Sequence, residues 1–219
     1  MDVCISSAIR SPVIVASSEF STTFPDDANP IGAPWTSPNV ANFFDMRTLG
    51  GIAFGTAASD LGYPDCYAFH SGFTGDYEIE AGIFRAADVN DTINHEVELH
   101  VCMAQDGTVV QSVEFLISVT GNPDMLKWEG ENPGAPFWTS LGITLLNAPG
   151  APANGDRMKF RKVGTTLTSF FKSGVNDFVQ TFDSFTSPFS TGCPGIATFT
   201  RAGGNPSKFC FTDVTIRAL

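Results

Sequence analysis

Short apolar segments, separated by clusters of Gly, Pro, Asn and Asp, recur along almost the whole chain. Within residues 76–81 (DYEIEA) and 95–101 (HEVELHV), apolar and polar residues alternate. A period of two places neighbouring side chains on opposite faces of a β-strand, so each of these strands has one apolar face. Asp106-Gly107 between two such segments predicts a tight hairpin, because glycine tolerates a positive φ. The pattern therefore predicts many short antiparallel strands.

The apolar segments define the strands that we expect. Their number and spacing are typical of a two-sheet antiparallel sandwich. Only 16% of the residues are charged, whereas helical chains of this size carry more charged and alanine-rich faces. No linker divides the sequence, so we expect an N-terminal arm over residues 1–17 and a single domain over residues 18–219. The clearest expected strands are residues 66–70, 76–85, 95–103, 109–120, 138–146, 157–163, 167–172, 178–182, 195–201 and 208–217.

Several segments resemble concanavalin A-like jelly rolls, including laminin-G-like and pentraxin-like domains. Residues 20–36 (FSTTFPDDANPIGAPWT) resemble their opening strand, which is followed by glycine and tryptophan. Residues 155–174 and 192–196 resemble their Gly-Asp strand, glycine turn and Gly-x-Pro-Gly run, and residues 211–219 (FTDVTIRAL) resemble their closing strand. The resemblance implies an all-β, two-sheet antiparallel jelly-roll sandwich. Domains of this kind serve as lectins, glycanases, lyases, adhesins and virus structural modules.

The formal net charge of −11 at pH 7 disfavours contact with nucleic-acid phosphates. The densest basic stretch contains Arg157, Lys159, Arg161 and Lys162, and we interpret it as a solvated strand face rather than an anion site. No segment has the length of a transmembrane span, and residues 1–20 are too polar for a signal peptide. We therefore expect neither a nucleic-acid partner nor membrane insertion.

Two rows of polar side chains mark the non-apolar faces of two strands: Asp76, Glu78 and Glu80 on one, and Glu96, Glu98 and His100 on the other. Facing rows of like charge would destabilise paired strands unless solvent, basic neighbours or a cation offset the repulsion. We expect a solvated outer face, with glycan or cation contact and catalysis as alternatives. Glycanases of the laminarinase type carry Glu-x-Asp-x-x-Glu on one strand, and this sequence differs in order and spacing. We therefore assign no catalytic residue, and the candidates for an enzyme are Glu78, Glu80, Glu96 and Glu98.

The same alternation assigns the opposite faces of these strands to the core. We expect Tyr77, Ile79, Val97 and Leu99 to point inward. His95 and His100 are five residues apart, which places them on opposite faces of a strand and argues against the helical zinc motif.

The five cysteines include no Cys-x-x-Cys pair, which argues against a structural zinc site. We expect most of them to be reduced and buried. Cys193–Cys210 and Cys66–Cys102 are the two bridges left open.

A Gly- and Pro-rich segment between two tryptophans is the best candidate for a sugar site. Aromatic rings beside planar polar groups suit carbohydrate, and loops on a rigid scaffold often carry binding function. The alternative is that one or both tryptophans seal an edge of the core. The candidate glycan-binding residues are Trp128, Glu129, Glu131, Asn132 and Trp138.

Calcium is the one cofactor that the family resemblance suggests. Relatives hold Ca²⁺ with oxygen ligands near the first and last strands. Asp26, Asp27 and Asp213 are the matching candidates in this sequence. The alternative is a structural role, with Asp26-Asp27 in a turn and Asp213 bonded to nearby backbone donors.

The sequence favours a non-enzymatic structural or binding module over an enzyme. We expect a virus or phage particle component, such as a head decoration, fibre or tail protein, with affinity for a surface glycan. The virion is then the expected location, and the cytoplasm is the alternative. An N-terminal arm over residues 1–17 would add a strand to a neighbour, so protein partners and a homo-oligomer are expected. The alternatives are a polysaccharide-active hydrolase or lyase and a calcium-dependent lectin.

Overall fold

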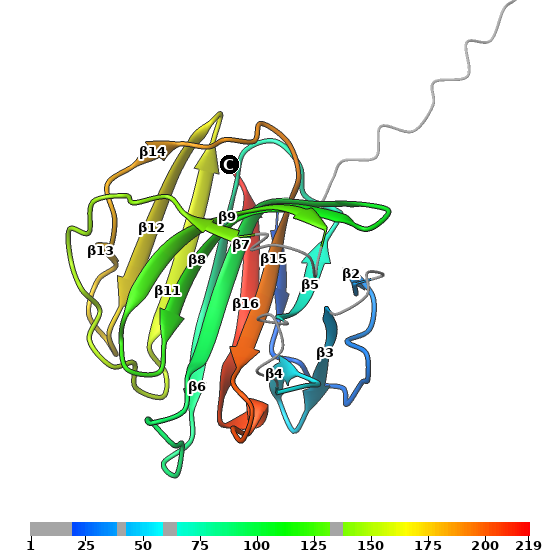
Figure 1. Cartoon of the computed structure of the whole chain (residues 1–219), viewed down its shortest axis with the longest axis vertical. Coiled ribbons are helices and arrows are strands. Elements are labelled where there is room, and N and C mark those ends of the chain that lie inside the picture. The colour runs from blue at the N-terminus through cyan, green and yellow to red at the C-terminus, as the bar shows by residue number, and fades with distance from the viewer. Residues whose placement is uncertain (1–18, 39–42, 59–64, 132–137) are drawn as a thin grey trace, which may run out of the picture.

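The structure is a computed structural model, and it describes residues 19–38, 43–58, 65–131 and 138–219, without the side chain of Glu131. Within these ranges the regular secondary structure is β-strand apart from one short 3-10 helix (Figure 1). The elements are β1 (Glu19–Thr22), β2 (Trp35–Thr36), β3 (Phe44–Leu49), β4 (Ile52–Gly55), β5 (Cys66–His70), β6 (Tyr77–Arg85), β7 (His95–Asp106), β8 (Val109–Ser118), β9 (Pro123–Glu131), β10 (Trp138–Ser140), β11 (Arg157–Val163), β12 (Thr166–Lys172), β13 (Val179–Gln180), β14 (Phe185–Thr186), β15 (Cys193–Thr200), η1 (Pro206–Lys208) and β16 (Phe209–Ala218).

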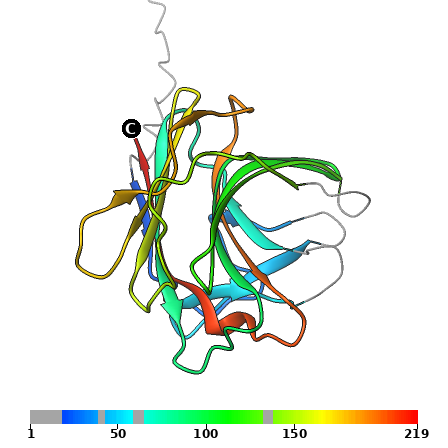
Figure 2. The ribbon, with the colours of Figure 1, turned by 60° about the vertical axis from the view of Figure 1, so that its left-hand side comes forward.

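The strands form two layers that face each other (Figure 2). Sheet A has the order β4-β16-β6-β11-β12-β13, with β1 also beside β16 and β14 beside β12. Sheet B has the order β10-β9-β8-β7-β15-β5, with β2 beside β5. β3 joins the layers, because it pairs antiparallel with β4 and parallel with β5. This is the expected two-sheet sandwich, closed by a last strand that pairs with the early strand β1.

The core lies between the two sheets and is filled from their inner faces. Tyr77, Ile79, Val97 and Leu99 are fully buried, so the inward assignment is confirmed. Phe160, Phe171, Phe182 and Phe209 are also in this core, and Trp35 is buried against it.

The predicted hairpin and most of the predicted strand positions are confirmed. A two-residue hairpin follows Asp106, and Gly107 there has a φ of 58°. The expected strand over residues 138–146 is wrong beyond Ser140, where β10 ends. We did not predict β9, because both of its faces are buried: Met125 faces the core while Leu126 and Trp128 face the other way. Alternation was therefore hidden, and Trp128 and Glu129 belong to a strand rather than to a loop.

The cysteines of the described residues form no disulfide. Cys66, Cys102, Cys193 and Cys210 are all free thiols, and all but Cys193 are buried. The two bridges left open by the sequence are therefore not formed here.

In the same described ranges there is no helix with the length and apolar character needed to cross a membrane.

Candidate functional site

The outer face of sheet B, which is turned away from sheet A, is covered rather than open to solvent. Alternate residues of β7, β8 and β9 point to this face, among them Glu96, Glu98 and His100. A second apolar cluster lies over it, which contains Phe43, Tyr67, Met103, Val110, Leu116, Leu126, Trp128 and Ala197.

This cover corrects one expectation from the sequence. Glu98 and His100 have no exposed surface, and Glu96 is only partly exposed, so their strand face is not the solvated surface that we predicted. The covering side chains of Phe43 and Tyr67 come from segments remote in sequence, which local alternation cannot reveal.

A cavity of about 390 Å³ opens on the same outer face. Planar polar groups and indole rings line it together, which is the mixture expected of a small-molecule site. Its carboxyl groups are those of Asp65, Glu96, Glu114 and Asp124, its amides are those of Asn94 and Asn122, and its rings are those of Trp128 and Trp138.

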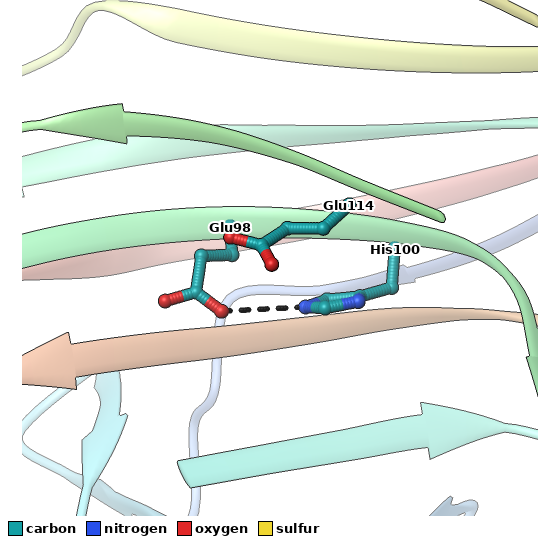
Figure 3. Close-up of side chains that lie close together, drawn as sticks. All are labelled: Glu98, His100 and Glu114. Atoms are coloured by element: carbon teal, nitrogen blue, oxygen red, sulfur yellow. Dashed lines mark hydrogen bonds and ion pairs between the residues drawn. The ribbon is translucent and has the colours of Figure 1, made fainter. Parts of the chain in front are cut away.

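Three side chains meet behind this cavity (Figure 3). Glu98 and His100 come from β7 and Glu114 from β8, which pairs with β7 so that His100 lies opposite Glu114. One ligating atom from each lies within 4.8 Å of the others. His100 Nε2 is 3.3 Å from Glu98 Oε2, and His100 Nδ1 is 2.9 Å from Ser112 Oγ. The outer face of sheet B therefore holds two carboxyl groups and an imidazole whose ligating atoms lie within 4.8 Å of one another.

Burial governs the ionisation of this group. It lowers the pKa of His100 to about 3, so the imidazole is neutral at pH 7. Burial raises the pKa of Glu98 and of Glu114 well above the usual range, and their neighbouring acids raise both further. Burial also raises the pKa values of Asp65 and Glu96. In the absence of a cation, protons must neutralise part of this acidic group.

Of the predicted sugar-site residues whose side chains the structure describes, Trp128 and Trp138 line the cavity and Glu129 does not. Trp128 is fully buried, donates its indole N–H to a carboxyl oxygen of Glu114 and stacks on Phe43 at 5.5 Å between ring centroids. It is therefore a fixed wall of the cavity. Trp138 is partly exposed and lies opposite Trp128 in the β9–β10 pair.

The other predicted sugar-site residues are not placed at the cavity wall. Glu129 is exposed and forms an ion pair with Lys127 at 2.6 Å. The side chain of Glu131 and all of Asn132 lie outside the described residues, as does the arm over residues 1–17.

The other acidic row lies on the outer face of sheet A and is neutralised by basic neighbours. β6 pairs with β11 and β16, not with β7, so the two acidic rows never face each other. Arg161 binds Glu78 at 2.7 Å, and Lys159 and Arg217 lie near both Glu78 and Glu80. Glu78 is only 6% exposed, so it is covered by its partners rather than solvated as we expected. Arg157, Lys159 and Arg161 are therefore one half of an ion-pair network, whereas Lys162 is buried and donates to the Gly75 carbonyl at 2.6 Å. The basic stretch is not the solvated strand face that we predicted.

The three calcium candidates are engaged in structural contacts. Asp213 accepts two hydrogen bonds from the Arg157 guanidinium, the shorter at 2.6 Å. Asp27 accepts a hydrogen bond from Gly50 N, and the Asp26 carbonyl accepts one from the Thr48 hydroxyl. Within the described ranges, the group of three acidic or imidazole ligands that could share an ion is Glu98, His100 and Glu114. Calcium at the three aspartates stays a prediction, and Asp213 would have to leave Arg157 to take part.

Sequence reasoning missed most of the polar wall. Asp65, Asn94, Glu114, Asn122 and Asp124 were not among the candidates, although all line the cavity. The sequence could have identified Glu114 as a candidate, because it is a single carboxylate within the apolar run of β8.

No protein-family model matches the chain, and no curated protein matches it. Several solved structures match the chain. The carbohydrate binding module CBM66 from Bacillus subtilis has a TM-score of 0.50 at 13% identity, covering 76% of this chain and 91% of that one. The CBM2 module of the evolved Dit of Lactobacillus casei BL23 phage J-1 has a TM-score of 0.51 at 12% identity, covering 90% and 93%.

The exoplasmic/lumenal domain of VIP36 in its Ca²⁺/Man2-bound form has a TM-score of 0.58 at 10% identity, covering 92% of this chain and 88% of that one. The chain thus has the concanavalin A-like jelly-roll fold that the sequence predicted. At these identities the likeness extends to the fold alone.

Proposed function

We propose that this chain is a non-enzymatic carbohydrate-binding module whose sugar site is the cavity on the outer face of sheet B. The observation that carries the proposal is the cavity's lining, in which carboxyl and amide groups lie beside the partly exposed ring of Trp138. Carboxylates and amides hydrogen-bond to hydroxyl groups in the plane of a sugar ring, while an indole packs against the ring's C–H face.

Two properties of the cavity support this use. Trp128 is held by Glu114 and Phe43, so part of the wall is rigid before any ligand arrives. Asn94 donates to Glu96 Oε1 at 2.8 Å, which fixes two polar groups relative to each other. Likeness of fold to a carbohydrate binding module and to a Man2-bound domain supports the same class of ligand.

The test is a glycan array followed by titration calorimetry with the sugars that bind. Trp138→Ala should weaken binding about 5- to 10-fold, because an aromatic contact of this kind contributes about 1–1.5 kcal/mol. Phe170→Ala, which removes a partly exposed ring from sheet A, is the matched control and should bind normally. An array without any signal, or equal affinity of Trp138→Ala and the parent protein, would refute the proposal.

A polysaccharide hydrolase or lyase is the second candidate, because Glu96 and Glu114 line one cavity and both have raised pKa values. A raised pKa suits a general acid. Two observations favour binding over catalysis: Glu114 is already held by Trp128, and Glu98 is fully buried. Release of reducing ends or unsaturated products from a polysaccharide, abolished by Glu114→Gln, would favour the enzyme.

We further propose that the module belongs to a virus particle, where it binds a surface glycan and contacts copies of itself or other particle proteins. The phage Dit module with the same fold supports this setting. Light scattering of the purified chain would reveal whether it forms an oligomer. Labelling of intact virus particles with an antibody against the chain would show whether the chain is part of the particle. A monomeric chain that is absent from particles would contradict this part of the proposal. A calcium-dependent lectin remains the alternative, and it predicts glycan binding that EDTA abolishes.

A further inference from the structure

The hydrogen bonds of Ser112 are compatible with a His100 tautomer that has its proton on Nδ1. The Ser112 hydroxyl lies 3.2 Å from the Val101 carbonyl oxygen, which can only accept. A hydroxyl has one hydrogen, so when it donates to that carbonyl its oxygen accepts from His100 Nδ1–H at 2.9 Å. The neutral imidazole then carries its lone pair on Nε2.

That lone pair faces the Glu98 carboxyl group. Nε2 and Oε2 are 3.3 Å apart, and both are acceptors when Glu98 is ionised. Two atoms that each bind a zinc ion at about 2.1 Å with tetrahedral geometry lie about 3.4 Å apart. The observed separation therefore matches two ligands of one ion, and it equally allows an Nε2–H donor to Glu98 when no ion is bound.

A second, independent feature is the other carboxyl oxygen of Glu98. Oε1 is fully buried, and no hydrogen bond from the described residues reaches it. Leaving a buried carboxylate oxygen without a partner is destabilising, and a bound cation or a proton on the carboxyl group would relieve this cost. Glu114 is the nearest additional ligand, within the 4.8 Å that encloses the three groups.

We propose that Glu98, His100 and Glu114 bind one divalent transition-metal ion of the zinc class, immediately behind the cavity. One imidazole nitrogen with two carboxylates suits such an ion, whereas calcium and magnesium prefer oxygen ligands throughout. Ser112 orients the imidazole and the Trp128 indole orients Glu114, which is the support that metal ligands usually receive. Glu114 also borders the cavity, which gives the ion a route from solvent. This site does not depend on the sugar proposal.

The test uses the whole chain after treatment with EDTA. Zn²⁺ is followed by titration calorimetry, and Co²⁺ is followed by the visible absorption of a four-coordinate ion. We expect saturation at one ion per chain. Glu98→Gln and Glu114→Gln, which keep the side-chain shape, should each weaken Zn²⁺ binding at least about 100-fold, and Ser112→Ala should weaken it about 10-fold.

Asp106→Asn is the control, because it removes an exposed carboxylate from the end of the same strand β7 and should bind Zn²⁺ normally. Circular dichroism of each variant confirms that it is folded. Absence of saturable Zn²⁺ and Co²⁺ binding, or equal binding by Glu98→Gln and the parent, would overturn the site. A stripped Glu98→Gln that is more stable than the parent and binds neither ion would show that a shared proton, not a metal, neutralises the group.

Discussion

Glu78 illustrates how much the surroundings of one carboxylate determine its contribution to stability. Burial favours its protonated form, but hydrogen bonds and charges of Arg161, Lys159 and Arg217 outweigh burial and hold its pKa below the ordinary 4.5. A carboxyl group with a lowered pKa in the folded state stabilises the fold above its unfolded pKa. That contribution is lost as the pH falls through the folded pKa.

We therefore expect Glu78→Gln to lower the free energy of unfolding by about 1–3 kcal/mol at pH 7, since three basic groups lose their shared partner. The difference from the parent should shrink as the pH falls below 4.5 and through the lowered pKa of Glu78 in the folded state. Urea unfolding of both proteins at a series of pH values measures this difference in unfolding free energy. Asp183→Asn, at an exposed position, is the control and should change little. A difference that stays constant from pH 7 to pH 3 would contradict this prediction.

Trp128 offers a second test at this scale. Trp128→Phe keeps an aromatic ring but removes the N–H that Glu114 accepts, so a buried carboxyl group loses its donor. We expect a loss of about 1–3 kcal/mol in unfolding free energy.

A double-mutant cycle with Glu114→Leu separates this hydrogen bond from lost packing. The double variant should be more stable than the two single effects predict, because no orphaned group remains. Strict additivity would mean that the hydrogen bond contributes nothing.

Among the elements, the β8–β9 connection shapes the mouth of the cavity. Gly121 has a φ of 87°, and a Cβ built there would lie 2.1 Å from the Gly150 carbonyl carbon. Its neighbours Asn122 and Pro123 line the cavity. Close backbone contact and positive φ together make this position unsuitable for a larger residue.

Comparing two glycines isolates the effect of close contact. Gly107→Ala places a Cβ in open space at a φ of 58° and should cost about 1 kcal/mol. Gly121→Ala has the same left-handed strain plus a backbone clash, so we expect a larger loss, about 3 kcal/mol or more, and weaker sugar binding. Thermal unfolding of both variants measures the difference. Equal losses of stability in the two variants would show that the backbone of the β8–β9 connection moves to accommodate the added Cβ.

The strands were predictable where one face is buried and the other polar. β5 and β11 begin and end where the alternation and turn residues placed them, and β7 overlaps its expected range. The strand β9 was not predictable, because residues on both of its faces are buried. A strand of this kind has the sequence pattern of a loop or a helix segment until its neighbours are known.

For the molecule as a whole, the C-terminal strand connects segments that are far apart in sequence. β16 pairs with β1, β4 and β6, so it lies inside sheet A with partners on both of its edges. Val214 and Ile216 are fully buried in the core. Loss of this strand would expose both the core and the unpaired edges of its neighbours.

Truncation after Phe211 should therefore prevent folding, which circular dichroism and size-exclusion chromatography would detect as an expanded or aggregated chain. Removal of Leu219 alone is the control, because its side chain is 57% exposed. A soluble, cooperative unfolding transition in the longer truncation would contradict the central role of β16.

The sequence by itself determined the all-β class, the hairpin at Gly107, the inward faces of β6 and β7 and the jelly-roll family of folds. The first three depend on local periodicity and turn chemistry, which neighbouring residues encode. The jelly-roll fold was implied by the resemblance of residues 20–36, 155–174, 192–196 and 211–219 to known domains. Only the tertiary structure decided whether a polar strand face meets water. Glu78 and Glu98 occupy equivalent positions in similar patterns, yet Arg161 covers one while Phe43 and Tyr67 help to cover the strand face of the other. Because these partners come from remote segments, alternation reports only that two faces differ, not what covers the polar one.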